Sequence, residues 1–422
     1  MINSKTYMAQ IETNQNFYHL ACIISASLGI PTIIVGKEIA VLYGAGTAIC
    51  SILIGNLILW LIGLAIISMT YEEKSNAVKN IQGYFGKKSA LLFALILTLT
   101  FLNWYVLQIS KSIISLETLY QYSYPWKSGS IIQIGAVIGL ISALLSIGGI
   151  TLLRWFTSIT FPLIVLYNIC IIATSEFSLF SEASWGVSFL GTITTTLTIL
   201  PGVVNLPTFF RHAKSRSHSF LGLSLLVTSV AFFECSSIWM SFSQESEFVL
   251  NGSTIPNLLT YVIPTTLFLG LSAISANMVN IYLASACYET FIKKLQGAKG
   301  HAIMGLLGTA MYTFVQISKP VKFIENLLTD YIAVLGIVLI IAVLSRLIVR
   351  HRPRRFEKII NSASWLVGCV VVTILQLSSP YEGVQPLLMG MGACVLFFLI
   401  VFFLEETVWS VQKLRKGDVS SS

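Results

Sequence analysis

Apolar runs of 18 or more residues recur from one end of the chain to the other. A helix of that length crosses the roughly 30 Å hydrocarbon core of a bilayer. The composition agrees, because 55% of the residues are hydrophobic and 10% are charged, whereas soluble domains carry about 25% charged residues. We therefore predict an all-α polytopic membrane protein.

Hydropathy predicts twelve transmembrane helices. They cover residues 17–36, 45–69, 91–112, 131–151, 155–174, 186–207, 220–241, 257–286, 302–317, 324–349, 361–378 and 385–404. The division between the fourth and fifth spans depends on Arg154 and Trp155 alone. The polar N-terminus and the long first apolar run favour a chain without a cleavable signal peptide.

The basic residues predict the orientation of these spans. With the N-terminus inside, 21 of the 26 Lys and Arg residues lie in cytoplasmic segments. Cytoplasmic loops of membrane proteins carry such an excess. We expect an integral protein of the plasma (inner) membrane with both termini in the cytoplasm. The net charge of +8 is then explained by topology, and nucleic acid is not an expected partner.

The first span is interrupted near its middle by polar and helix-breaking residues, among them Ser25, Ser27, Leu28, Gly29 and Pro31. Proline removes a backbone donor, and glycine loosens the backbone. Unwound backbone inside a membrane is tolerated where it is buried or lines a cavity, and there it can bind substrate and ion. The alternative is a proline kink without a ligand.

A second interruption, around Leu200, Pro201 and Gly202, falls in the sixth span, five spans after the first. Broken helices at matching positions are typical of transporters built from two inverted repeats. We predict a five-plus-five inverted repeat with broken first and sixth helices. The expected divisions are 1–16 (N-terminus), 17–180 and 181–350 (repeats), 351–405 (helices 11 and 12) and 406–422 (tail).

Two residues of the third span suit a planar ligand. Trp104 and Gln108 are four residues apart and so share a helix face. Indole offers a flat apolar surface, and an amide offers a donor and an acceptor to the edge of a nucleobase-like heterocycle. The alternative is a packing tryptophan beside an interhelical hydrogen bond.

The eighth span contains a small, polar stretch from Ser272 to Asn280, in which Ser272 and Ser275 lie on one face. Hydroxyl and carbonyl oxygens are the ligands that a hard cation such as sodium prefers. Small residues also allow close helix packing, which is the other explanation.

Few charges fall inside the spans. Glu234 lies near the middle of the seventh, and Glu325 and Asp330 lie near the outer end of the tenth. A carboxylate inside a membrane is a functional candidate, so Glu234 is a candidate for proton coupling.

Motifs of soluble enzymes do not occur in the sequence. It has no Walker phosphate loop and no HExxH, and its seven cysteines have neither metal-ligand nor disulfide spacing. We predict a protein that is not an enzyme, has no cofactor, and draws on a gradient of Na⁺ or H⁺ for any pumping.

Several stretches resemble the nucleobase–cation symporter family, most of all its cytosine permease branch. They are ILIGNLIL, FGKKSALL, NWYVLQ, NLPTFFRHAK and LSAISANMVNIYLAS. The resemblance implies a LeuT-like fold of the APC superfamily, with one substrate held between the broken helices and the third and eighth spans, and one sodium ion or proton carried along.

Residue by residue, the resemblance implies that Trp104 stacks on the substrate ring and Gln108 is the polar residue four positions later. Ser272 and Ser275 match cation ligands, and the cation-binding carbonyls of the first span fall near Ile24 to Leu28. The substrate asparagine falls on Asn277 or Asn280.

The chain also departs from that family. Ala276 stands at a second hydroxyl position, the acidic residue after the sixth span is replaced around Pro207 and Thr208, and the sixth-span break has no aromatic residue. The expected function is import of a nucleobase or related planar heterocycle by cation symport with alternating access. An amino-acid or amine transporter of the same fold and a non-transporting receptor are the alternatives.

Overall fold

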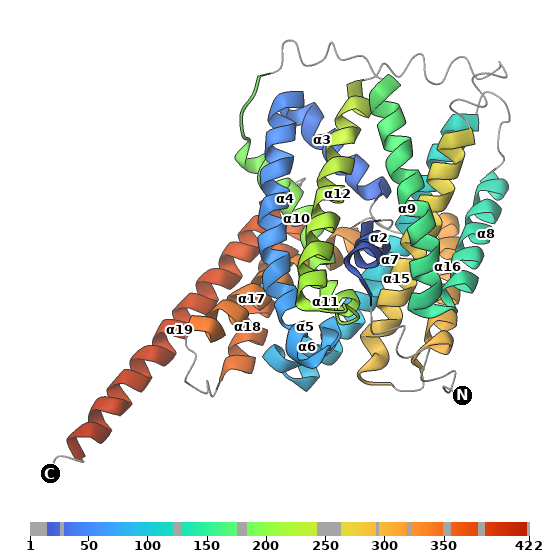
Figure 1. Ribbon diagram of the computed structural model, residues 1–422. Coiled ribbons are helices and arrows are strands. Elements are labelled where there is room, and N and C mark those ends of the chain that lie inside the picture. The colour runs from blue at the N-terminus through green and yellow to red at the C-terminus, as the bar shows by residue number, and fades with distance from the viewer. Residues whose placement is uncertain are drawn as a thin grey trace.

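The computed structural model describes residues 15–25, 29–120, 128–174, 184–242, 263–292, 295–318, 323–348, 356–378 and 385–419. Its helices form one bundle (Figure 1). They are α2 (Phe17–Ser25), α3 (Gly29–Tyr43), α4 (Ala45–Ser68), α5 (Thr70–Glu73), α6 (Ala77–Phe85), α7 (Lys87–Tyr120), α8 (Ser128–Ser146), α9 (Gly149–Thr174), α10 (Phe189–Val203), α11 (Leu206–Phe210), α12 (Arg216–Phe242), α15 (Ile263–Glu289), α16 (Ala298–Ser318), α17 (Phe323–Ile348), α18 (Glu357–Ser378) and α19 (Gln385–Val419).

Eight helices of the described chain are long and apolar enough to cross a membrane. They are α4, α7, α9, α12, α15, α17, α18 and α19. Many large apolar side chains point outward, such as Leu396 and Phe403 on α19, which are 61% and 63% exposed. A hydrocarbon surround accounts for such an apolar exterior. The prediction of an all-α polytopic membrane protein is confirmed.

The first span is two helices. α2 ends at Ser25 and α3 begins at Gly29, which is the place the sequence predicts. Pro31 is the third residue of α3, where a missing N–H has no intrahelical partner to lose. Ser27 and Leu28 lie outside the described residues, and of Gly29 only its place in the helix is described.

The sixth span is also broken, but later than predicted. α10 continues through Leu200, Pro201 and Gly202 to Val203, and the chain turns at Val204 and Asn205. The Asn205 amide donates to the carbonyl of Pro201 at 3.1 Å. The break forms after Pro201, where an asparagine side chain can satisfy a carbonyl freed at the end of the helix.

The division between the fourth and fifth spans was predicted in the wrong place. α8 ends at Ser146 and α9 begins at Gly149, so Arg154 and Trp155 lie inside α9. The turn falls at Ile147 and Gly148, and Gly149 has φ +62°, in the left-handed region that favours glycine. Gly148 and Gly149 mark the turn between the fourth and fifth spans, and Arg154 does not.

The packing of the helices repeats with a shift of five spans. α12, the seventh span, packs on α2 and α3, while α4, the second span, packs on α10 and α11. In the same way, α7 packs on α16 and α15 packs on α8. Exchanging the first five spans for the second five leaves these pairs unchanged, as the predicted inverted repeat requires.

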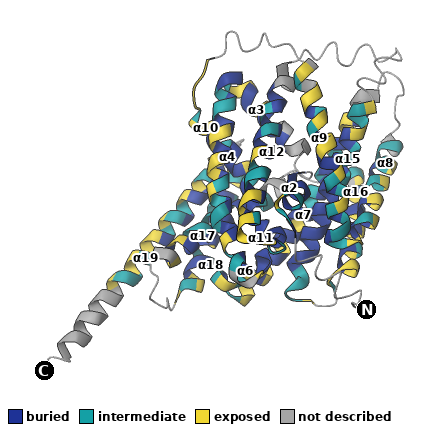
Figure 2. Cartoon of the chain, in the orientation of Figure 1, coloured by how far each residue is buried: buried dark blue, intermediate teal, exposed yellow. Residues whose placement is uncertain are grey.

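One helix forms the centre of the bundle. In its most apolar 18-residue window α15 is 78% buried, against 28% for α19 at the periphery. Figure 2 shows the same contrast between the dark interior helices and the yellow outer faces. The small residues of α15 allow neighbouring helices to approach closely.

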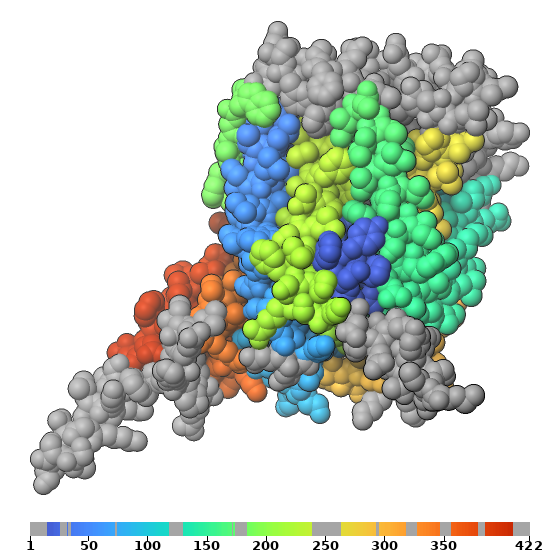
Figure 3. All heavy atoms as spheres, in the orientation of Figure 1, coloured from blue at the N-terminus to red at the C-terminus, as the bar shows by residue number. Residues whose placement is uncertain are grey.

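The two broken helices meet at the end of the bundle that carries α5 and α6, here called the α6 end (Figure 1). The N–H of Gln15, just before α2, donates to the carbonyl of His212, and the N–H of Lys214, after α11, donates to the carbonyl of Gln15. In Figure 3 the start of α2 lies at the surface between α12 and α9.

The end of α19 also lies at this α6 end (Figure 1). The cytoplasmic location of the α6 end stays a prediction. A hydrogen bond connects α11 to α6 at this end of the bundle. The Thr208 hydroxyl accepts it from the N–H of Ala77, the first residue of α6. A hydroxyl therefore meets the start of α6 at the position where the resemblance implies an acid.

Candidate functional site

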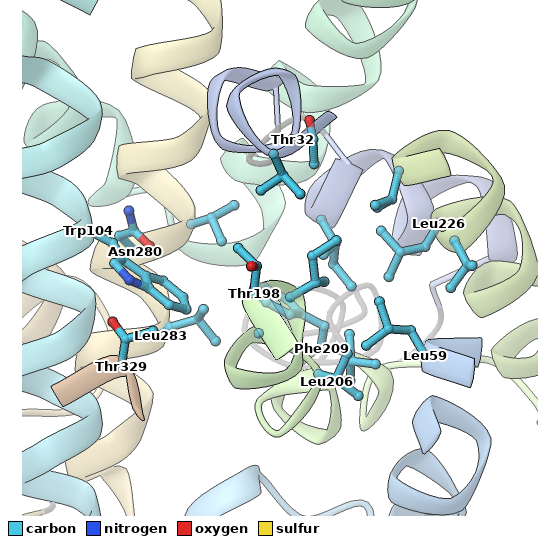
Figure 4. A pocket seen from close by; sticks show the side chains of 18 of the residues that line it. Thr32, Leu59, Trp104, Thr198, Leu206, Phe209, Leu226, Asn280, Leu283 and Thr329 are labelled. Carbon is cyan, nitrogen blue, oxygen red and sulfur yellow. The ribbon is translucent and has the colours of Figure 1, made fainter. Parts of the chain in front are cut away.

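A cavity of about 300 Å³ lies between the two breaks. Its lining comes from both broken helices and from α4, α7, α12, α15 and α17, and it is mostly apolar. Figure 4 shows Trp104 and Asn280 together on one side and Leu59 and Leu226 on the other. This volume lies at the small end of the range of about 300–1,000 Å³ for ligand pockets.

Trp104 and Gln108 both line the cavity from α7. The indole is half-buried and meets Phe101 edge-on, with ring centroids 5.7 Å apart at 75°. Gln108 is 7% exposed, and its Oε1 has no hydrogen-bond partner among the described residues. An indole and an amide whose oxygen lacks a partner in the described chain therefore line the same space.

Of the two asparagines on α15, Asn280 lines the cavity and Asn277 does not. Asn277 is fully buried, and neither its Oδ1 nor its Nδ2 is bonded within the described chain. Buried amides are rarely left unpaired in proteins, so Asn277 is a position where a polar partner is expected.

The breaks contribute fewer residues to the lining than the sequence predicts. Ile24 and Gly202 line the cavity, but Ser25, Leu200 and Pro201 are not among its lining residues. Leu200 is fully buried and packs where α10 meets Gly336 of α17. Gly202, which lines the cavity, is two residues further along, about half a helical turn, and so lies on the opposite face of α10.

The predicted cation ligands are buried away from the lining. Ser272 and Ser275 are fully buried on α15, which packs against α2 and α9. The Ser275 hydroxyl lies 3.1 Å from that of Thr160 on α9, and the hydroxyls of Ser272 and Ser25 have no partner among the described residues. Because α2 ends at Ser25, the carbonyls of its last turn also lack partners within the helix.

Glu234 is fully buried on α12 and does not itself line the cavity. Its Oε2 accepts a 2.5 Å hydrogen bond from Nδ2 of Asn56 on α4. Asn56 does line the cavity, so it connects the carboxyl group to that space. The described chain has no cluster of three or more His, Cys, Asp or Glu residues that could bind a metal ion.

Sequence reasoning missed several lining residues, notably Asn56, Phe209, Thr198 and Lys111. Asn56 could have been found, because it is an amide within the apolar run of the second span. Phe209 lay beyond the predicted end of the sixth span at residue 207. The structure thus brings an aromatic side chain of the sixth span to the cavity, from α11 and not from the break.

On the α6 side of the cavity, four residues form a polar cluster, here called the Arg211 cluster: Arg211, His212, Tyr282 and Glu289. Arg211 donates to both carboxylate oxygens of Glu289, at 2.8 and 3.3 Å, and to the Tyr282 hydroxyl at 3.3 Å. His212 Nε2 lies 2.9 Å from the same hydroxyl. Burial lowers the pKa of Arg211, but Tyr282 and Glu289 outweigh it, so the net shift is upward and the guanidinium stays charged.

Solved transporters share this fold at low sequence identity. A Na⁺-coupled sialic acid symporter in a substrate-bound, outward-open state is 14% identical, with a TM-score of 0.68 over 93% of this chain and 90% of its own. Mhp1, a nucleobase-cation-symport-1 family transporter, in a closed conformation with bromovinylhydantoin bound, is 16% identical, with a TM-score of 0.64 over 94% of each chain.

MhsT in complex with L-phenylalanine is 15% identical, with a TM-score of 0.57 over 93% of this chain and 99% of its own. No protein-family model and no curated protein matches the sequence. These likenesses show the LeuT-like fold, and the structural neighbours are transporters and not enzymes.

Proposed function

We propose that this protein is a secondary transporter that imports a nucleobase or related planar heterocycle together with a cation. The observation that carries the proposal is that Trp104 and Gln108, whose buried amide oxygen has no partner among the described residues, line one small cavity between two broken helices. A planar ring stacked on Trp104 would place its edge within reach of an amide. The solved neighbour Mhp1 holds such a ring, in bromovinylhydantoin.

The charge of the cavity favours a neutral heterocycle over an amine. Lys111 is the one charged residue among those that line it in the described chain. An ammonium group buried there would have no carboxylate partner in the lining, and an unpaired buried charge is costly. Asn280, Thr198 and Gln108 offer neutral polar groups, as a heterocycle with amide-like edges requires.

Were the coupling cation a sodium ion, it would bind where α2 ends against α15. The hydroxyls of Ser272 and Ser275, with the carbonyls of the last turn of α2 near Ile24 and Ser25, would supply hard oxygen ligands. The C-terminal end of a helix also carries a partial negative charge. In alternating access, binding of substrate in the cavity and of the cation at the end of α2 would favour the rearrangement of the broken helices.

Uptake into proteoliposomes tests the proposal. Radiolabelled cytosine, uracil, adenine and hydantoin are offered under an imposed sodium gradient and, separately, a proton gradient, with empty liposomes as the control. Accumulation of one ring under one gradient, resistant to competition by amino acids, is the expected result. Accumulation of an amino acid in place of any ring, or ring binding without flux, would contradict the proposal.

A further inference from the structure

We propose that the Asn56–Glu234 pair is a proton-binding site and that the coupling ion carried with the substrate is a proton held on Glu234. This inference rests on the proposed transport function and names its coupling ion. It starts from a carboxyl group that is fully buried inside the membrane-spanning part of α12.

No basic side chain neutralises Glu234. The ion pairs within the described chain join Arg211 to Glu289 and Arg346 to Glu357. The one hydrogen-bond donor to the carboxyl group is Nδ2 of Asn56, and Oε1 of Glu234 has no partner among the described residues. An ionised carboxylate with a single neutral donor is poorly solvated, so this environment favours the protonated form.

The other ionisable groups on the packed elements do not change this. α2 contributes His19 and Cys22, α3 contributes Lys37 and Glu38, which are exposed, and α9 contributes the half-buried Arg154. Cys50 of α4 and Cys235, next to Glu234 on α12, are thiols. Asn56 is the side chain of the described chain that is hydrogen-bonded to the carboxyl group.

Asn56 gives the site its route to the substrate. It lines the cavity and is bonded to Glu234, and its own Oδ1 has no partner among the described residues. An amide can donate to a carboxylate through Nδ2 or accept from a protonated carboxyl through Oδ1. Asn56 and Glu234 can therefore be hydrogen-bonded to each other in both protonation states. Which amide atom of Asn56 is engaged, and hence which one is left for the cavity, depends on whether Glu234 is protonated.

The site also touches a part of the molecule that must move. A Cβ added at Gly36 of α3 would lie 2.1 Å from the backbone carbonyl of Glu234 and 2.2 Å from Oγ of Ser237. α3 follows the first break, so the backbone of the residue that carries the proton packs against the broken helix. Each cycle would bring one proton in on Glu234 with one substrate and release it on the other side.

The experiment uses the whole protein in proteoliposomes, with labelled uracil and cytosine as probes. A gradient of one pH unit supports about tenfold accumulation of a neutral substrate that enters with one proton. We expect about tenfold accumulation by the wild-type protein and none by Glu234→Gln. In the same variant, the exchange of labelled for unlabelled base should no longer depend on pH. Glu234→Asp restores part of the accumulation.

Asp330→Asn is the matched control, because Asp330 is also bonded to a side-chain amide, that of Gln376 at 2.6 Å, but Gln376, unlike Asn56, does not line the cavity. It is expected to accumulate base as the wild-type protein does. Proton-driven accumulation by Glu234→Gln at the wild-type level, or a sodium-driven uptake insensitive to pH, would overturn the proposal.

A second measurement does not depend on the substrate. Infrared difference spectra between acid and alkaline pH report the carbonyl stretch of a protonated carboxyl group. A band present in wild-type protein and in Asp330→Asn, and lost in Glu234→Gln, supports the proton site even if no base is transported. A wild-type spectrum in which no band depends on Glu234 contradicts it, whatever the uptake assay shows.

Discussion

Phe209 stacks on Tyr282, with ring centroids 5.4 Å apart and an interplanar angle of 23°. Phe209 lines the cavity, and Tyr282 is bonded to Arg211 and lies 2.9 Å from His212. One pair of rings therefore connects the cavity wall to the ion pair between Arg211 and Glu289. We expect this contact to couple the contents of the cavity to the opening of the α6 end.

Arg211→Ala should open the α6 end. Hydrogen bonds to a charged group contribute about 1.5–3 kcal/mol, so their loss shifts the closed population by about 10- to 100-fold. The rate at which a membrane-impermeant thiol reagent reacts with a cysteine placed at Leu206, in a cysteine-free protein, should rise accordingly. Arg346→Ala removes a more exposed ion pair with Glu357 and is the control. Equal labelling rates in the two variants would show that the Arg211 cluster does not hold the end closed.

Trp104→Ala should abolish uptake and leave expression in the membrane intact. Stacking of a base on an aromatic side chain contributes about 1–3 kcal/mol, and Trp104→Phe should keep part of it. Binding of labelled base, measured by equilibrium dialysis, should weaken by about 10- to 100-fold in Trp104→Ala. Trp155→Ala is the control, because Trp155 is 61% exposed on the outer face of α9. Normal uptake by Trp104→Ala would remove Trp104 from the site.

Ala276→Ser should strengthen sodium binding if sodium occupies the space beside Ser272 and Ser275. The new hydroxyl lies four residues after Ser272, on the same helix face, and adds a hard oxygen ligand. Sodium-dependent stabilisation against heat is the measurement, and the midpoint should move to lower sodium concentration. Ala273→Ser, at another fully buried alanine of α15, should not move it. An identical response of both variants would argue that no sodium ion binds there.

Gly36→Ala should destabilise the protein, because its Cβ would meet the backbone carbonyl of Glu234 as well as the hydroxyl of Ser237. Overpacking of this kind costs about 1–3 kcal/mol. The midpoint of thermal unfolding in detergent should fall. Gly202→Ala provides the comparison, since a Cβ there has no atom within 4 Å and enters the cavity. That variant should keep its thermal stability and reduce substrate affinity, and a stable Gly36→Ala protein would contradict the close packing of α3 on α12.

The sequence by itself determined the class of protein and its repeat. Runs of apolar residues can only be helices in a bilayer, because every backbone group must be satisfied within the segment. The two interruptions, at Ser25 to Pro31 and at Leu200 to Pro207, are local chemistry, so their positions five spans apart were readable without a structure. Trp104 and Gln108 could be placed on one face because helical spacing is local as well.

Only the tertiary structure decided which polar residues meet. Asn56 and Glu234 are 178 positions apart, and helical periodicity says nothing about which faces of α4 and α12 come together. The same limit explains why Ser25, Leu200 and Pro201 were expected in the cavity lining, while Asn56 and Phe209 were not. Even the sixth-span break moved past Pro201, because an asparagine four residues later could satisfy the carbonyl that the turn exposes. Long-range packing, and not local propensity, placed these groups.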